Sequence, residues 1–297
     1  MSKASNVEQL FHRIHLFLVE GQADMALATL AQISTSDANQ EYEVAYLRAW
    51  CATLRGNWDT VAALLSSADS LGHEGVDLPS LGQTERRRRV YYLLLLGQAA
   101  NYLGYFEEAT RHYTQCIKFL DERRMNILSV RIKARCGLGR AYTQIGFYAV
   151  ALAHYENALQ LCRTDERTCP DLLEIHAGLC TVHRCLGHVE QALIYGQQAL
   201  QWCQERSNDA RSLGPIHNLL GQVFFQKHAF EEATFHYTEA LELAKRINSL
   251  ELILTNLTAL ASVRLEEGLL EEARCLYEQG LVYQTGVSDA RLVGALY

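Results

Sequence analysis

Proline and long apolar runs are both scarce in this chain. Only three of its 297 residues are proline, at Pro79, Pro170 and Pro215. No apolar run approaches the roughly 20 residues that a helix needs to cross a bilayer, and the N-terminal segment lacks the charged-then-apolar order of a signal peptide. With 49% hydrophobic and 21% charged residues, the composition predicts a well-packed chain in the cytoplasm, with no membrane partner.

Sequence signatures of catalysis are missing as well. The chain has no GxxxxGKS/T phosphate loop, no GxGxxG after a strand, no GxSxG turn and no HExxH zinc motif. Its acidic pairs, such as Glu107-Glu108 and Glu231-Glu232, stand where helices are expected to begin and where carboxylates are favoured. We therefore predict that the protein is not an enzyme and needs no cofactor.

Internal repetition is the strongest positive signal in the sequence. Three stretches nearly copy one another: HYTQCIKFL (112–120), HYENALQLC (154–162) and HYTEALELA (236–244). Each belongs to a unit in which one amphipathic helix ends near a glycine and a second helix opens with an acidic or polar run and an alanine. The alanines are Ala109, Ala151, Ala192, Ala233 and Ala273, spaced 42, 41, 41 and 40 residues apart, with weaker copies ending at Ala26 and Val61. Such spacing predicts a stack of about seven antiparallel helical hairpins.

Small residues recur where the two helices of a unit must approach each other closely. In the first helices these are Gly97, Gly139, Cys180, Gly221 and Ala261, and in the second helices Ala158, Ala199 and Ala240. We expect Tyr113, Tyr155 and Tyr237 to fill the space beside them, so that all of these positions are interior.

The repeats divide the chain into four stretches of one elongated domain over residues 1–297. Residues 1–70 hold two degenerate repeats, 71–89 an insertion that forms a seam, 90–286 five well-matched repeats, and 287–297 the start of an eighth repeat or a capping helix. The last stretch contains DARLVGALY, which lines up with DARSLGPIH two units earlier. Because its end is apolar, we expect either truncation of a longer protein or self-association through the C-terminal end.

The repeat pattern resembles that of the tetratricopeptide repeat family. The residues that carry the resemblance most fully are Gly139, Tyr142, Gly146, Tyr148, Ala151, Tyr155 and Ala158. The spacing of 40 to 42 residues exceeds the family's usual length of about 34, and the proline that usually closes a unit is missing. This longer spacing is similar to that of kinesin light chains, polarity adaptors and repeat modules of bacterial regulators. The resemblance implies an all-α, right-handed superhelical solenoid that binds protein segments.

The family resemblance also implies a concave groove lined by side chains of the first helices. The candidates are Tyr46, Trp50, Tyr91, Leu94, Gln98, Asn101, Lys133, Arg140, Thr143, Arg184, Asn218, Gln222 and Phe225, together with Glu174, Thr258 and Ser262. Amide side chains in this set can pair with a peptide backbone, and Lys133, Arg140 and Arg184 form a basic centre. We expect the groove to favour an acidic peptide with an apolar anchor. The alternatives are a solvated wall or a groove filled by a terminal helix.

Nine cysteines and a repeated histidine position raise the question of disulfides or metal. The cysteine count is odd and there is no CxxC pair, while Cys116 and Cys180 occupy small-residue positions. Buried free thiols in a reducing compartment are therefore expected. His112, His154 and His236 share one repeat position, but helices stack roughly 8 to 10 Å apart whereas zinc holds its ligands at about 2 Å. No metal site is predicted.

The charge pattern contains one basic run inside an acidic chain. The formal net charge is −7, yet residues 85–89 read ERRRR. We interpret this run as a solvated helix start, with a nuclear signal or an anionic contact as alternatives. Duplex nucleic acid is an unfavourable partner for the surface as a whole.

Two classes of function remain open from the sequence. The first is a non-enzymatic scaffold that binds a peptide segment. The second is the sensory or regulatory arm of a larger, bacterial type of signalling or transcription-regulating protein, and a weaker third is a subunit that recruits substrate for an enzyme.

Overall fold

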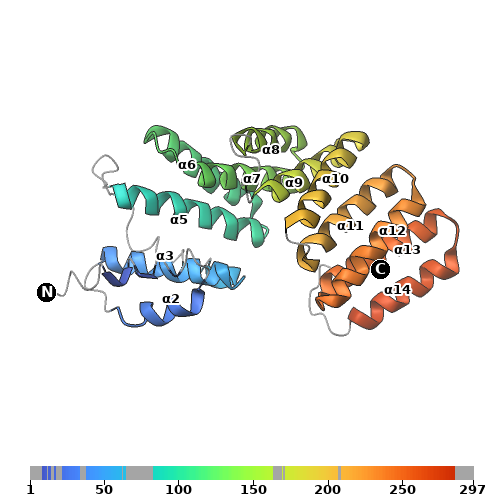
Figure 1. Cartoon of the computed structure of the whole chain (residues 1–297), viewed down its shortest axis with the longest axis horizontal. Coiled ribbons are helices and arrows are strands. Elements are labelled where there is room, and N and C mark those ends of the chain that lie inside the picture. The colour runs from blue at the N-terminus through green and yellow to red at the C-terminus, as the bar shows by residue number, and fades with distance from the viewer. Residues whose placement is uncertain are drawn as a thin grey trace. The chain divides into compact units, whose positions relative to one another are not determined.

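The computed structural model describes most of the chain as helices joined by short turns (Figure 1). The described residues are 9–11, 13–14, 17, 22–33, 38–61, 63–64, 83–162, 169, 171–206 and 209–284. The helices are α2 (Ala23–Leu30), α3 (Ala38–Leu54), α5 (Gln83–Tyr102), α6 (Phe106–Glu122), α7 (Leu128–Ile145), α8 (Tyr148–Cys162), α9 (Leu172–Cys185), α10 (Val189–Arg206), α11 (Ala210–Gln226), α12 (Phe230–Arg246), α13 (Leu250–Glu266) and α14 (Leu270–Gln284). Over these residues no strand occurs, and none of the helices is both long and apolar enough to cross a membrane.

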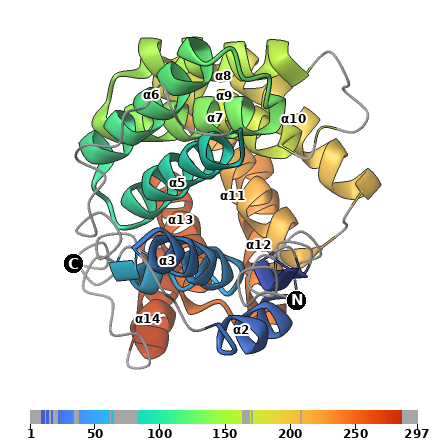
Figure 2. The same cartoon turned by 90° about the vertical axis from the view of Figure 1, so that its left-hand side faces the viewer.

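The chain forms two compact units, Met1–Phe147 and Tyr148–Tyr297. In unit 1, α5, α6 and α7 all pack against one another, and α2 packs against α3 (Figures 1 and 2). In unit 2, contacts join α8 to α9, α9 to α10, and each following helix to the next as far as α14. First helices also touch across a repeat, as α9 does with α11 and α11 with α13. Each unit therefore has the neighbour-to-neighbour packing of a helical repeat.

The turns between paired helices share one backbone geometry, as the repeated glycine predicts. Gly104, Gly146, Gly187 and Gly268 adopt left-handed φ values of 83°, 97°, 79° and 78°. The following amide then donates to a carbonyl five residues back, for example from Phe147 to Tyr142 at 2.9 Å. This arrangement satisfies carbonyls that the helix end would otherwise leave open. His228 takes the glycine position in α11–α12 with φ 59°.

Tyrosine rings occupy the space that small residues leave in the first helices. A Cβ on Gly97 or Gly137 would lie 2.6 or 2.2 Å from the ring of Tyr113, so this ring fits only because both positions lack a side chain. In unit 2, Tyr155 stands against Gly178 and Tyr237 against Gly221 in the same way. The predicted packing is confirmed for Gly97 and Gly221, whereas the sequence analysis missed Gly137 and Gly178.

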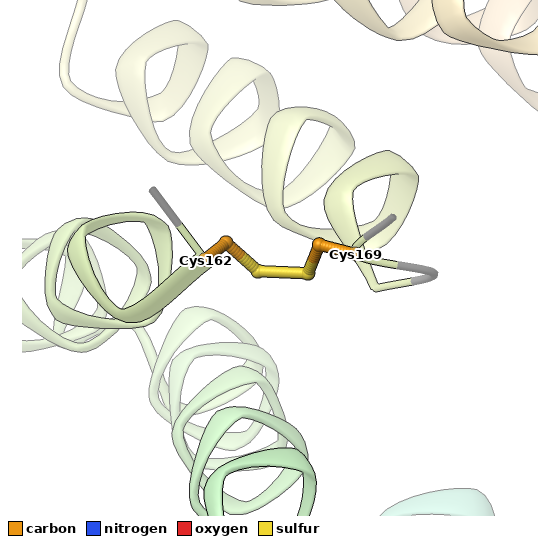
Figure 3. The surroundings of a disulfide bond; sticks show 2 residues. All are labelled: Cys162 and Cys169. Atoms are coloured by element: carbon orange, nitrogen blue, oxygen red, sulfur yellow. A yellow bond between two sulfur atoms is a disulfide. The ribbon is translucent and has the colours of Figure 1, made fainter. Parts of the chain in front are cut away.

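One disulfide corrects the expectation that all nine cysteines are free. Cys162, the last residue of α8, is bonded to Cys169, just ahead of α9, and their side chains point toward one another (Figure 3). The seven-residue separation lacks any recognised motif, which is why the sequence did not reveal the pair. Most other cysteines are buried thiols as predicted, but Cys185 is half-buried and Cys275 is exposed.

Parts of the predicted domain layout lie outside the described residues. This holds for most of the 71–89 insertion and for the whole 287–297 stretch. Of the basic run, Arg87 is exposed while Arg86 and Arg89 are half-buried, all within the first two turns of α5. The degenerate repeats of residues 1–70 contribute α2, α3 and a core that includes Leu30, Leu47 and Val61.

Candidate peptide-binding surface

Aromatic side chains of unit 1 form the first part of the predicted groove. Trp50 lies between Tyr46 and Tyr91, with ring centroids 6.0 and 5.9 Å away. Tyr46 is only 2% exposed and Leu94 only 5%, so both belong to the core rather than to an open wall. Trp50 and Tyr91 are half-buried and remain the apolar candidates on this side.

Asn101 connects two first helices of unit 1. Its Nδ2 donates to the carbonyl oxygen of Gly137 at 3.0 Å and approaches the hydroxyl of Tyr113 at 3.4 Å. The side chain is 8% exposed, and its Oδ1 is buried without a hydrogen-bond partner. A buried acceptor of this kind is costly to leave open, so Asn101 offers an acceptor to a ligand or an ordered water. Gln98, one turn earlier on α5, is half-buried.

The basic candidates of unit 1 lie on one side of α7. Lys133 and Arg140 are seven residues apart, which is two helical turns, and both are exposed. Thr143 is half-buried, and its hydroxyl donates to the carbonyl of Gly139 at 2.7 Å. Thr143 is therefore engaged by its own helix, while Lys133 and Arg140 present charge to solvent.

Arg184 is the basic candidate of unit 2, on α9. It is half-buried, its Nε is buried without a hydrogen-bond partner, and its Nη2 lies 3.8 Å from the sulfur of Cys185. Among the described residues it has no carboxylate partner. Burial raises the pKa of Cys180 to about 12 and also raises that of Tyr237, and in both cases the charge of Arg184 opposes the shift. The guanidinium thus sits among buried side chains without a counter-ion.

An amide network joins two first helices of unit 2. Asn218 donates from Nδ2 to Oδ1 of Asn256 at 2.8 Å, and Gln222 donates from Nε2 to Oδ1 of Asn218 at 2.8 Å. Asn256 in turn donates to the carbonyl of Leu252 at 2.7 Å. Asn218 and Asn256 are 8% and 1% exposed, whereas Gln222 is half-buried, so the network holds Gln222 in place at the surface. Sequence reasoning missed Asn256, because it lies outside the family positions that define the groove.

The remaining candidates of unit 2 are less constrained. Phe225 is half-buried, and its ring centroid lies 5.9 Å from that of Phe230. Ser262 donates to the carbonyl of Thr258 at 3.0 Å, and both are half-buried, as is Glu174. The structure gives these residues no shared contact that would define a pocket.

Two histidine pairs in unit 2 were not anticipated. Nδ1 of His217 lies 3.0 Å from Nδ1 of His236, and Nδ1 of His183 lies 3.4 Å from Nδ1 of His188. Burial, followed by the charge of His217, lowers the pKa of His236 to about 4. Burial also lowers the pKa of His217, against the effect of Glu239. Within the described residues no three metal-binding side chains come together.

Comparison with known proteins identifies the architecture. Residues 130–205 match the sequence model of the tetratricopeptide repeat. A Rap protein complexed with competence and sporulation factor superposes with a TM-score of 0.79 at 13% identity, covering 98% of this chain and 80% of that one. NprR in complex with its cognate peptide NprX gives 0.74 at 16% identity, covering 98% and 81%. Aspartyl phosphate phosphatase F from Bacillus subtilis gives 0.62 at 11% identity, covering 100% and 78%. No curated protein sequence matches the chain.

The paired helices, their left-handed turns and the tyrosine packing define an α-helical repeat protein. Within this class, residues 130–205 match the tetratricopeptide repeat, and the fold is similar to that of the Rap and NprR structures over 98% of the chain. The predicted all-α fold is confirmed, and the predicted repeat family is confirmed over residues 130–205.

Proposed function

We propose that the chain binds a peptide segment of a partner protein along its first helices, with a carboxylate of that segment on Arg184. The observation that carries this proposal is the half-buried guanidinium of Arg184, which has no carboxylate partner among the described residues. An uncompensated, partly buried charge is costly, and a ligand carboxylate would offset that cost through a charge-assisted hydrogen bond. Unit 2, in which Arg184 lies, carries 11 Lys and Arg against 19 Asp and Glu, a formal net charge of −8. A cation without a carboxylate partner among the described residues is therefore unusual in this unit.

Backbone recognition is the second part of the proposal. Gln222, held by Asn218, and Asn101, held by the carbonyl of Gly137, are amides whose oxygens have unused acceptor capacity. A peptide backbone supplies N–H donors to such oxygens irrespective of its sequence. Trp50, Tyr91 and Phe225 are the apolar candidates for its side chains. NprR, which is similar in fold and binds its cognate peptide NprX, supports this type of ligand.

The protein is proposed to act without catalysis, as a cytoplasmic binding protein. The sequence carries none of the four catalytic motifs named above. The phosphatase among the structural neighbours shares the fold at 11% identity, and a shared fold does not transfer its activity. Self-association through the C-terminal end stays a prediction, because residues 287–297 lie outside the described residues.

A pull-down from lysate with identification by mass spectrometry tests the proposal. We compare the intact chain with a variant carrying Arg140→Glu and Arg184→Glu, and with a matched control carrying Arg111→Glu and Arg246→Glu. The control makes the same change in charge, one substitution in each unit, at exposed positions of second helices.

We expect a partner that the control retains and the groove variant loses, with both variants folded by circular dichroism. A synthetic peptide from that partner should then bind the intact chain, and replacement of its acidic residues by amides should weaken binding about tenfold or more, since a charge-assisted hydrogen bond contributes about 1.5 to 3 kcal/mol. Partners that persist unchanged in the groove variant would show the proposed site to be wrong.

A role as the regulatory arm of a larger protein is the second candidate. It is favoured by the structures of the quorum sensor NprR and of a Rap conjugation gene regulator, whose own chains extend beyond the aligned region, with 80% and 78% covered. An immunoblot of the endogenous protein decides between the two: a mass well above the 33.5 kDa of this chain supports the arm, and a matching mass the free-standing scaffold.

A further inference from the structure

Three helix ends of unit 1 come together at one edge. Val90 near the start of α5, Leu120 near the end of α6 and Val130 near the start of α7 belong to a single buried cluster. The sulfur of Cys116 on α6 also donates to the carbonyl of Val90 at 3.4 Å. These contacts place the start of α5, the end of α6 and the start of α7 next to one another, away from the Gly104 turn.

Arginine dominates this edge. The described arginines on it, hereafter the arginine edge, are Arg86, Arg87, Arg89, Arg123, Arg124, Arg131 and Arg135. Among the described side chains, Asp121 and Glu122 are the carboxylates of the same helix ends, and Glu85 precedes the arginines in the sequence. Because the whole chain has a formal net charge of −7, this concentration of positive charge is not a consequence of overall composition.

Two of these side chains, Arg89 and Arg123, are held in place by aromatic rings and have no anionic partner among the described residues. Arg89 lies over the ring of Tyr92 at 5.4 Å and Arg123 over the ring of Phe119 at 5.8 Å. A guanidinium nitrogen of each, Nη1 of Arg89 and Nε of Arg123, is buried without a hydrogen-bond partner. Stacked guanidinium groups lose less side-chain entropy on binding an anion, because the aromatic ring already restrains them.

The start of α7 adds a close pair of cations to the edge. Arg131 binds Asp121 at 2.5 Å. Burial lowers the pKa of the neighbouring Arg135, as does the charge of Arg131, and Asp121 only partly offsets this. Asp121 therefore acts on both guanidinium groups.

The fold itself gains little from arginine at these positions. Arg86 ends the first turn of α5, where the helix dipole disfavours cations, and Arg87 and Arg89 follow in the second turn, where this effect has largely faded. Arg124 adopts a left-handed φ of 48°, a conformation that favours glycine or asparagine, and Asn248 occupies the corresponding turn of unit 2. Cations placed against both preferences indicate that their charge serves binding.

We propose that the arginine edge is a second interaction surface, which binds an Asp- and Glu-rich segment of a protein partner independently of the first-helix site. Guanidinium groups match carboxylates through paired hydrogen bonds. Asp121 and Glu122 interrupt the positive track that a nucleic-acid backbone would follow, which favours a protein segment. At 100° per residue, Arg131 and Arg135 lie on the side of α7 opposite Lys133 and Arg140, so the two surfaces can be occupied at the same time.

The test measures fluorescence anisotropy of a labelled peptide of alternating Asp and Glu with the full chain, at about 0.15 M salt so that long-range charge effects are screened. The edge variant carries Arg87→Gln and Arg124→Asn, which remove two exposed charges, and asparagine suits the left-handed position. The matched control carries Arg48→Gln and Arg111→Gln, which remove two exposed charges of the same unit that belong to neither surface, and a groove variant carries Lys133→Gln and Arg140→Gln. Labelled single-stranded DNA of equal charge is the competing probe.

We expect the edge variant to bind the acidic peptide about tenfold more weakly and the control to bind it as the intact chain does. A loss confined to the groove variant would place the peptide in the first-helix site and overturn the edge proposal while supporting the proposed function. Equal losses would mean attraction by overall charge, and tighter binding of the DNA would make nucleic acid the partner; either result overturns the proposal, as does the absence of binding.

Discussion

At the scale of single residues, the absence of a side chain determines how the helices pack. Gly178 and Gly214 are both helical glycines of unit 2, but their surroundings differ. A Cβ on Gly178 would lie 2.3 Å from the ring of Tyr155, which is only 4% exposed, whereas the nearest atom to a Cβ on Gly214 is 3.7 Å away. One position requires glycine and the other has room for alanine.

We therefore expect Gly178→Ala to lower the free energy of unfolding by about 1 to 3 kcal/mol through overpacking. Gly214→Ala should change it by less than about 1 kcal/mol, because the higher helix propensity of alanine is opposed by Pro215, which disfavours a helical backbone for a non-glycine residue before it. Urea unfolding followed by circular dichroism measures both. Equal effects of the two variants would contradict the tyrosine packing described here.

A second residue-scale prediction concerns the His217–His236 pair and pH. The pKa of His236 is about 4 in the folded chain, below the value of about 6.5 for an unfolded histidine. Between these values the unfolded chain binds the proton and the folded chain does not, so stability falls as the pH drops from about 6.5 toward about 4. Glu239 acts in the opposite direction on His217 and limits the loss.

His236→Tyr tests this origin, since unit 2 already contains the equivalent pair His176 and Tyr195 with ring centroids 6.0 Å apart. We expect the melting temperature of this variant to fall less than that of the intact chain between about pH 7 and about pH 5. An identical fall in both proteins would assign the pH dependence to other groups.

At the scale of helices and turns, the repeat pattern gave the positions of the second helices and of their turns. Glycine supplies the left-handed residue in five turns within repeats, Gly56 included, and among the described turns of this kind only the α11–α12 turn departs from it, with His228. The alanine, glycine and tyrosine positions were predictable because they depend on contacts between neighbouring segments that recur along the chain. By contrast, the Asn218–Asn256 hydrogen bond and the histidine pairs join positions that do not recur in each unit, so no sequence pattern indicated them. The predicted binding site was the least accurate part, because Tyr46 and Leu94 are too buried to line a surface.

The disulfide between α8 and α9 allows a prediction about this pair of helices. Closing a loop with a sequence separation of seven residues removes conformational freedom from the unfolded chain, an effect of roughly 2 kcal/mol. Cys169→Ser should lower the free energy of unfolding by about this amount in oxidising buffer and change it little in the presence of a reductant. Because disulfides are rare in the cytosol, the reduced form would predominate there. A stability difference that persists in the reductant would show that Cys169 contributes through packing instead.

At the scale of the whole molecule, charge and stability are distributed unevenly between the two compact units. Unit 1 carries 16 Lys and Arg against 15 Asp and Glu, a formal net charge of +1, while unit 2 has −8. Both proposed surfaces follow from this distribution. The arginine edge concentrates the cations of unit 1, and Arg184 is an uncompensated cation within an acidic unit.

The division into two units also predicts how destabilisation spreads. In a helical repeat each hairpin is stabilised mainly by its neighbours, so a defect is felt most within its own packed core. Gly178→Ala disrupts the packing of α8 against α9. Gly97→Ala disrupts the packing of unit 1 in the same way, because its Cβ would lie 2.6 Å from the ring of Tyr113. We expect hydrogen exchange followed by mass spectrometry to show faster exchange in α8–α10 for the first variant and in α5–α7 for the second. If either variant accelerates exchange equally from α5 to α14, the chain unfolds as one cooperative body, and the two units are a feature of its geometry rather than of its stability.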